Sequence, residues 1–434
     1  MRQYFSALAA FTALLLCATT AQATLTIDIT KGNTEPMPIA ITDLTGNDVG
    51  GVGATITQVV AADLERSGLF RPISNQAFIE HVTNGDAIPR FADWRQINAQ
   101  ALVTGTISPG AGDKVRVSFR LWDALGQQQV AGKEYNTTGR NARRVGHLIA
   151  DEIYKRLTGE NGYFDSRIVY VAQSGPETHR IKRLAIMDQD GANHKYLTDG
   201  GALVLTPRFS PNTQQILYMS YAGNQARVYL RDLQSGREES MGKFAGMSFA
   251  PRFNFDGTKM LMSIASGGTT SIYEMDLRSR QMRRLTNASG VIDTSPSYAP
   301  DGQHITFNSD RGGSQQVYVM DASGGNIQRI SFGSGEYGTP VWSPRGDLIA
   351  FTKQYGGQFY IGVMHPDGSG ERLLTQSWLD EGPSWAPNGR VIVFTREASG
   401  GGRSQLYSVD ITGFNLREVP TPIDGSDPAW SPLL

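Results

Sequence analysis

Six copies of one short pattern, a proline followed two residues later by an aromatic side chain, divide the second part of the chain. The copies are Pro207-Arg208-Phe209, Pro251-Arg252-Phe253, Pro296-Ser297-Tyr298, Pro340-Val341-Trp342, Pro383-Ser384-Trp385 and Pro428-Ala429-Trp430. Their prolines are spaced 44, 45, 44, 43 and 45 residues apart. A period of this length is typical of a β-propeller built from four-stranded blades. We therefore expect an all-β six-bladed β-propeller over residues 164–434.

Each repeat also contains the turns and strands of one blade. In the third copy, a turn at residues 299–302 ends in glycine, which accepts the positive φ that such turns often need. The apolar runs at residues 305–307 and 317–320 predict the next two strands. A polar fourth strand, as at residues 283–286, completes the unit.

The two ends of the repeat array predict how the ring closes. Residues 167–171 begin the array with the pattern of a second strand, and no first strand precedes them. The chain ends on Pro428-Ala429-Trp430-Ser431-Pro432, which has the pattern of a first strand. The C-terminal strand 428–432 should therefore pair with the start of the array and complete the sixth blade. Closure protects strand edges that would otherwise promote aggregation.

The first 23 residues have the composition of a secretory signal peptide. Arg2 precedes an apolar stretch over residues 4–17, and Ala21-Gln22-Ala23 fits the small-residue cleavage pattern. Cleavage is expected between Ala23 and Thr24, which predicts an exported protein. The single cysteine, Cys17, lies inside this segment. The bulky Leu16 before it disfavours a lipoprotein, so the mature chain should have no cysteine.

Charge excludes two broad classes of partner. The formal net charge is −1, and removal of Arg2 changes it to −2. Lysine and arginine are dispersed along the chain, whereas nucleic-acid binding and attraction to anionic membranes both call for a basic cluster. We expect neither a nucleic-acid partner nor a direct membrane span.

Residues 36–160 lack the repeat and predict a small N-terminal α/β domain. Apolar residues at helical spacing predict a helix over residues 55–64, and strict alternation predicts a strand over residues 115–121. Asn141 is expected to cap a last helix that stops near Gly159. The preceding segment, residues 24–35, is expected to form an extended N-terminal arm.

The arm has two possible roles that its sequence leaves open. Leu25, Ile27 and Ile29 alternate with polar residues, a pattern that suits adding a strand to the sheet of a partner. The same pattern suits an edge strand packed on its own domain.

Three candidate chemistries were weighed against structural explanations. Asp188-Gln189-Asp190-Gly191 resembles the start of a calcium loop, but aspartates recur at the equivalent turn of other repeats, so turn chemistry is favoured. No G-x-S-x-G nucleophile elbow occurs, and the six histidines form no close pair. The recurring aromatics favour packing between blades over sugar stacking.

We therefore expect no catalytic, cofactor-binding or metal-binding residues and no enzymatic activity. The alternative is a propeller hydrolase or lyase acting on periplasmic polysaccharide or peptide, whose carboxylates would meet in the channel without a linear motif.

The chain resembles the TolB family, the periplasmic components of the Tol-Pal envelope system. The resemblance rests on residues 294–302 with 307–310, on residues 379–384 and on the terminal residues 428–432, behind this N-terminal domain. It implies a periplasmic scaffold that binds the lipoprotein Pal through the propeller and the C-terminal domain of TolA through the arm. It further implies a role in outer-membrane integrity and in constriction at cell division. Bacteriocins and outer-membrane proteins are further implied partners.

The strand order places the expected binding surfaces. The chain enters and leaves the propeller at turns between first and second strands, so the α/β domain should lie toward that face. The opposite mouth remains for Pal, with candidate residues Ala250, Asp293, Thr294, Tyr337, Asp380 and Glu381. The arm expected to bind TolA comprises Thr24, Leu25, Thr26, Ile27, Asp28, Ile29, Thr30, Lys31, Gly32, Asn33, Thr34 and Glu35.

Overall fold

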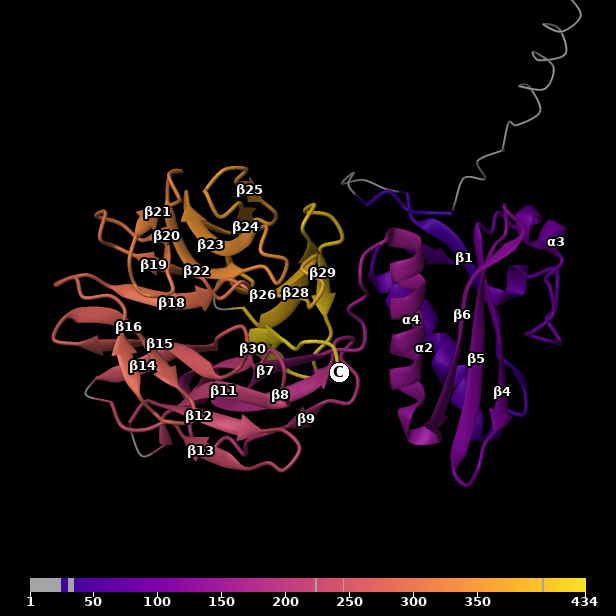
Figure 1. The fold of residues 1–434 in the computed structure, drawn as a ribbon, viewed down its shortest axis with the longest axis horizontal. Coiled ribbons are helices and arrows are strands. Elements are labelled where there is room, and N and C mark those ends of the chain that lie inside the picture. Colours follow the sequence, from indigo (N-terminus) through magenta and orange to yellow (C-terminus); the bar gives the residue numbers. More distant parts are fainter. Residues whose placement is uncertain (1–24, 30–34, 223–224, 245, 400–401) are drawn as a thin grey trace, which may run out of the picture.

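The computed structural model describes residues 25–29, 35–222, 225–244, 246–399 and 402–434. It consists of a small α/β domain and a six-bladed β-propeller that lie side by side (Figure 1). This architecture confirms the predicted fold class. The expected signal peptide and its cleavage site at Ala23 and Thr24 lie outside the described residues.

One mixed sheet forms the centre of the α/β domain. Its strands are β1 (Met37–Ile41), β2 (Thr45–Gly46), β3 (Phe70–Pro72), β4 (Ala101–Pro109), β5 (Lys114–Asp123) and β6 (Gln128–Thr138). The order is β3-β1-β4-β5-β6, with β2 pairing β4. Strand β1 is parallel to both of its neighbours, and β4, β5 and β6 are antiparallel. The expected strand over residues 115–121 is therefore confirmed as part of β5.

Helices cover both faces of this sheet. They are α2 (Val52–Arg66), α3 (Phe91–Gln96) and α4 (Ala142–Thr158), together with the short 3-10 helices η1 (Val49–Gly51), η2 (Asn75–Ala77) and η3 (Gly139–Asn141). The long helices α2 and α4 pack together on one face, and α3 packs with Trp122 and Leu102 on the other. Both long helices were expected. Gly159 ends α4 with a φ of 77°, and Asn141 occupies the N-cap position as expected, although its side chain makes no capping bond.

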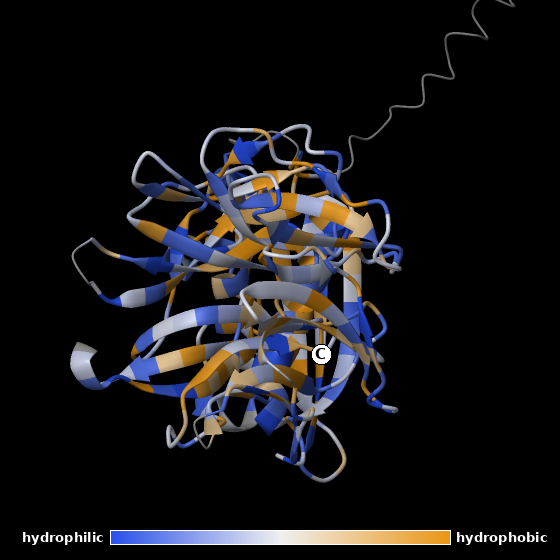
Figure 2. Ribbon diagram, turned by 90° about the vertical axis from the view of Figure 1, so that its left-hand side faces the viewer, coloured by the Kyte–Doolittle hydropathy of each residue, from blue (hydrophilic) through white to orange (hydrophobic). Residues whose placement is uncertain are grey.

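The six blades are four-stranded antiparallel sheets. Blade 1 has β10 (Val204–Phe209), β11 (Gln215–Ser220), β12 (Arg227–Asp232) and β13 (Glu238–Ser240); blade 2 has β14 (Met247–Phe253), β15 (Lys259–Ser266), β16 (Thr269–Asp276) and β17 (Met282–Arg284). Blade 3 has β18 (Asp293–Tyr298), β19 (His304–Ser309), β20 (Gln316–Asp321) and β21 (Gln328–Arg329); blade 4 has β22 (Glu336–Trp342), β23 (Ile349–Tyr355), β24 (Gln358–Met364) and β25 (Arg372–Leu373). Blade 5 has β26 (Leu379–Trp385), β27 (Val391–Glu397), β28 (Ser404–Asp410) and β29 (Arg417–Val419). Figure 2, seen from the propeller end of the molecule, shows hydrophobic and hydrophilic stretches alternating along the strands.

The sixth blade joins the two ends of the array, as the repeat pattern predicted. It consists of β30 (Asp424–Trp430), β7 (Arg167–Ser174), β8 (Ile181–Asp188) and β9 (Lys195–Tyr196), with the 3-10 helix η4 (Glu177–His179) between β7 and β8. Trp430 pairs with Ile168, and the amide of Ser431 donates to the carbonyl of Arg167 at 2.8 Å. The closing strand begins at Asp424 and is longer than its sequence pattern indicates.

A β-bulge recurs in the first strand of every blade. The pairing register shifts before the residue that follows the repeat proline. The residue before that proline has a positive φ in each copy: Thr206, Ala250, Ser295, Thr339, Gly382 and Asp427. Such bulges re-aim side chains. Here they bring the residues after the proline to the wall of the central channel in all six blades.

The repeat aromatics pack between neighbouring blades. Trp342, Trp385 and Trp430 are buried, and the indole of Trp385 donates to the carbonyl of Val341 in the preceding blade at 3.0 Å. The amide of Trp430 donates to Ser384 of blade 5 at 3.0 Å. For these three residues, the packing interpretation is confirmed.

The α/β domain contacts the propeller face that carries the turns between first and second strands. Glu160 forms an ion pair with Arg345 at 2.6 Å, and the amide of Asn388 donates to the carbonyl of Asn161 at 3.1 Å. Tyr163 lies against the blade-6 residue Trp430 within one continuous hydrophobic core. The domain therefore lies where the strand order predicted. Among the described residues, no helix is both long and apolar enough to cross a membrane.

Candidate functional site

The six expected Pal-binding residues lie on first strands, which begin at the mouth opposite the α/β domain. Ala250 lies in β14, and Thr294 lies near the start of β18, where it pairs with Asn308. Both are half-buried, and Glu381 near the start of β26 is exposed. Of the six expected residues, these three are the ones that are accessible to solvent.

Asp293 and Asp380 instead support the mouth from within. Asp293 is buried and accepts two bonds of 2.8 Å from the guanidinium of Arg311. Asp380 is 0% exposed and accepts bonds of 2.7 and 2.6 Å from Arg396. Each pair ties the start of a first strand to the end of the next strand or the turn beyond it. Bidentate pairs of this kind hold a fixed geometry.

Tyr337 is also buried, and its hydroxyl donates to the carboxylate of Glu371 at 2.9 Å. The ammonium of Lys353 lies 2.7 Å from the same carboxylate and 4.7 Å from the ring of Tyr337. Burial is the largest cause of the raised pKa of Tyr337, so its hydroxyl stays protonated. The structure therefore places Tyr337 as a support of the mouth and not on its surface.

Exposed apolar side chains surround this mouth, and the sequence analysis missed them. Each is between 41% and 73% exposed. Each of blades 1 to 5 contributes one such residue, either in the connection that leads into its first strand or at the start of that strand. In blade order they are Leu203, Met247, Ile292, Phe332 and Trp378. We call these five residues the apolar rim. Their types differ from blade to blade, so no repeat motif revealed them. Their common position before each first strand is the signal that could have found them.

Glu381 adds negative charge beside the rim. Although its side chain is exposed at the mouth, partial burial is the largest cause of its raised pKa, followed by the neighbouring carboxylates of Asp427 and Glu397. Glu381 therefore places a carboxyl group beside the apolar rim, near those of Asp427 and Glu397.

The described part of the expected TolA-binding arm packs on its own chain. Leu25, Ile27 and Ile29 are buried, and the amide of Ile27 donates to the carbonyl of Leu157 at 2.7 Å. Arg390 in the propeller donates to the carbonyl of Ile29 at 3.1 Å. The segment is extended and packs on its own chain without forming a regular strand. Thr24, Thr30, Lys31, Gly32, Asn33 and Thr34 lie outside the described residues, and Glu35 is exposed.

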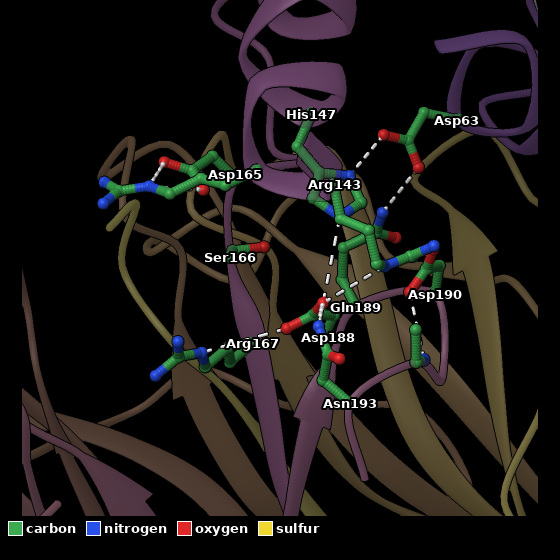
Figure 3. Close-up of polar contacts among 12 residues, drawn as sticks. Asp63, Arg143, His147, Asp165, Ser166, Arg167, Asp188, Gln189, Asp190 and Asn193 are labelled. Carbon is green, nitrogen blue, oxygen red and sulfur yellow. Dashed lines mark hydrogen bonds and ion pairs between the residues drawn. The ribbon is translucent and has the colours of Figure 1, made fainter. Parts of the chain in front are cut away.

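A polar cluster joins the α/β domain to blade 6 (Figure 3). We call it the interdomain cluster; it consists of Asp63, Arg143, His147, Asp188, Gln189 and Asp190. Asp63 on α2 is fully buried and lies 2.6 Å from Nδ1 of His147 on α4. Its other oxygen accepts a bond of 2.8 Å from Gln189 of the propeller.

Electrostatics favour a charged histidine in this cluster. Burial alone would lower the pKa of His147, but the hydrogen bond to Asp63 and the nearby Asp190 and Asp188 raise it above its ordinary value. Burial opposes the ionisation of Asp190, yet the amide of Ala192 and the charge of Arg143 lower its pKa. The cluster is an ion-pair network across the two parts of the chain.

His147, Asp188 and Asp190 could also be considered as metal ligands, since their ligand atoms lie within 4.8 Å of one another. Arg143, however, forms ion pairs with both carboxylates. Asp188 accepts a bond of 2.6 Å from Asn193, and Asp190 accepts one from the amide of Ala192. The equivalent aspartates Asp232, Asp276 and Asp410 accept the same kind of turn bonds. These bonds fit the turn interpretation, which stays a prediction.

Two family models match successive parts of the chain. The TolB beta propeller domain matches residues 154–434, and the TolB amino-terminal domain matches residues 25–130. The chain is 50% identical over 416 residues to the Tol-Pal system protein TolB of Gluconobacter oxydans. The aligned region covers 95% of this chain and 89% of that relative.

Solved structures agree with these matches. The crystal structure of TolB from Acinetobacter baumannii has a TM-score of 0.82 at 31% identity and covers 94% of this chain and 100% of that chain. Hydrazine synthase from Kuenenia stuttgartiensis, at 14% identity and a TM-score of 0.50, covers 61% of this chain and 46% of that chain and shares the fold alone. The family models and the half-identical relative show that this chain belongs to the TolB family of the Tol-Pal system.

Proposed function

We propose that this chain is a non-enzymatic protein-binding scaffold that works in the periplasm. Its propeller mouth binds Pal, and its N-terminal arm binds the C-terminal domain of TolA. By holding both partners, it links the inner membrane with the peptidoglycan and the outer membrane and supports constriction during cell division. Membership of the TolB family is the basis of this proposal.

The apolar rim is the observation that carries the proposal for Pal. Five large apolar side chains are exposed around one mouth, on the face that the α/β domain leaves uncovered. Clustered exposed apolar side chains mark protein-binding surfaces, because a soluble protein gains nothing from exposing them to water. Glu381 and the half-buried Thr294 lie inside this rim and provide polar contacts.

The buried residues of the mouth support the same function. Asp293, Tyr337 and Asp380 are fixed by charged partners before any ligand arrives. A surface held in its binding geometry loses less conformational freedom on association, which favours tight binding. We therefore propose that these three residues act by positioning the mouth.

The extended form of the arm supports the proposal for TolA. Its apolar side chains pack on α4 and the propeller without forming a sheet, so its extended backbone can transfer to a partner. Cleavage after Ala23 would leave Leu25 one residue from the new N-terminus. Export through this signal peptide is part of the proposal, as is use of the same surfaces by bacteriocins.

A capture assay with purified Pal tests the mouth. We expect Thr294→Trp and Glu381→Trp to weaken the binding of Pal at least tenfold while leaving the melting temperature within about 2 °C of that of the parent protein. Thr213→Trp, at an exposed turn on the opposite face, is the matched control and should bind normally. Unchanged binding in both mouth variants would place the Pal interface elsewhere.

Deletion of residues 24–35 tests the arm. We expect the deleted protein to lose binding to the C-terminal domain of TolA but to keep binding to Pal. Because Leu25, Ile27 and Ile29 are buried, the melting temperature must be measured in parallel. Retained affinity for TolA would defeat the role of the arm without affecting the proposal for Pal.

A further inference from the structure

Two positively charged arginine side chains lie near each other in the propeller channel. Arg208 on β10 and Arg252 on β14 follow the repeat proline in the first two blades. Both line a cavity of about 360 Å³ at the centre of the ring. The equivalent positions of the other blades carry Ser297, Val341, Ser384 and Ala429, so the basic pair is specific to one side of the channel.

Neither guanidinium is neutralised within the part of the chain that the structure describes. The guanidinium of Arg252 has no hydrogen bond or ion pair there. Arg208 donates only to the carbonyl of Pro207 at 2.6 Å, and its buried Nε has no partner among those residues. The carboxylate of Asp427 acts on Arg208 but lies beyond ion-pair distance.

This arrangement is unfavourable without a counter-charge. Burial is the largest cause of the lowered pKa of both arginines, and the charge of Arg208 lowers that of Arg252 further. Arginine nevertheless remains protonated in proteins, because its pKa starts above about 12. Arg208 and Arg252 are both half-buried, so the fold holds two like charges together in the channel, where an opposite charge is attracted to both.

We propose that this channel binds a small oxyanion, of the phosphate or carboxylate class, between Arg208 and Arg252. Guanidinium groups match the geometry of such anions through paired N–H donors. The hydroxyls of Ser297 and Ser384 line the same cavity and accept bonds from the amides of Trp342 and Trp430. A hydroxyl that accepts through its oxygen still has its hydrogen to donate, so Ser297, on the blade next to that of Arg252, has a donor available for the anion.

Titration of the full-length mature protein with inorganic phosphate, followed by calorimetry, tests the site. A second titration with acetate separates a phosphate site from a carboxylate site, and sodium chloride at matched ionic strength controls for screening. We expect Arg252→Gln and Arg208→Gln each to weaken phosphate binding by roughly tenfold or more, because each removes a charged donor. Arg237→Gln, at an exposed turn of blade 1, should bind as the parent does.

The Asp427→Asn variant should change the affinity for phosphate in the opposite direction. Residue 427 has a φ of 51°, which asparagine tolerates, so the bulge should persist. Removing the nearby negative charge should strengthen phosphate binding. The proposal would be overturned if all of these variants bound phosphate with the affinity of the parent. It would also be overturned if neither phosphate nor acetate showed saturable binding to the parent or to any variant.

Thermal unfolding gives an independent reading. At ten times the dissociation constant, phosphate should raise the melting temperature of the parent by about 2 °C. Without phosphate, Arg252→Met should melt above the parent, because it removes one of two repelling charges. A lower melting temperature for this variant in both conditions would show that the pair serves packing alone.

Discussion

Nδ1 of His147 lies 2.6 Å from Oδ2 of Asp63, and this contact joins α4 to α2 next to the propeller. The second oxygen of Asp63 accepts from Gln189, so a single buried carboxylate connects three elements and both parts of the chain. Nε2 of His147 faces Asp188 of blade 6 at 4.0 Å. The charged imidazole thus adds one electrostatic contact to the hydrophobic core that joins the two parts.

We expect stability to depend on pH through His147. Its pKa in the folded chain is raised above its ordinary value, so its stabilising contribution is fully present below about pH 6.5 and is lost as the pH rises through the folded pKa. His147→Leu should lower the free energy of unfolding by about 1.5–3 kcal/mol at pH 6 and by less at pH 8.5. Urea unfolding at both pH values measures the difference.

His147→Gln is the control for this prediction. Its neutral amide can still donate to Asp63, so part of the stability should return. The amide does not titrate, so its stability relative to the leucine variant should not change with pH. An equal loss for His147→Leu at pH 6 and pH 8.5 would contradict the role of the charged imidazole.

Asp151 gives a second pH effect near the linker. Burial raises its pKa to about 7, although its carboxylate accepts bonds from the amides of Phe164 and Asp165. The folded state therefore prefers the protonated carboxyl, and that preference is lost as the pH rises from about 4 through about 7. Relative to the parent, Asp151→Asn should become more stable as the pH increases from 5 to 8. A relative stability that is flat over this range would show that the carboxyl does not titrate there.

Breaking a bidentate pair of the mouth should destabilise the propeller. Asp380 is fully buried, so Asp380→Asn leaves Arg396 without its charged partner and should cost about 3–5 kcal/mol of unfolding free energy. Glu381→Gln, at the exposed neighbouring residue, should change stability by less than about 0.5 kcal/mol. Chemical denaturation of both variants distinguishes support of the mouth from contact at its surface.

The ring could be predicted from the sequence because each blade repeats the same local requirements. A proline, an aromatic side chain and a glycine turn recur at one spacing, and the C-terminal Trp430 carries the pattern that residues 167–171 lack. Each of these signals lies within a few neighbouring residues, so a single sequence is enough to detect it. Alternation and helical spacing predicted the α/β domain for the same reason.

Burial at the mouth could not be predicted in this way. Asp293 and Asp380 were expected on the surface, but each is buried against an arginine. Their partners Arg311 and Arg396 lie 18 and 16 residues away and follow no motif, so the sequence did not reveal the pairs. The interdomain cluster combines residues 63, 147 and 189, which only the tertiary fold brings together. The rim residues share a position but no residue type.

Closure by the last strand makes a final prediction. Strand β30 covers the edge of β7, and Trp430 packs with Tyr163 while its indole donates to Ser166 at 2.8 Å. Deleting residues 424–434 would expose an apolar core and an unpaired strand edge, both of which promote aggregation. We expect the truncated protein to lose its folded monomer in size-exclusion chromatography and its cooperative melting transition. Deleting only residues 433–434, which lie beyond β30, should preserve both. A monomeric, cooperatively melting protein after the longer deletion would show that the ring does not need its C-terminal strand.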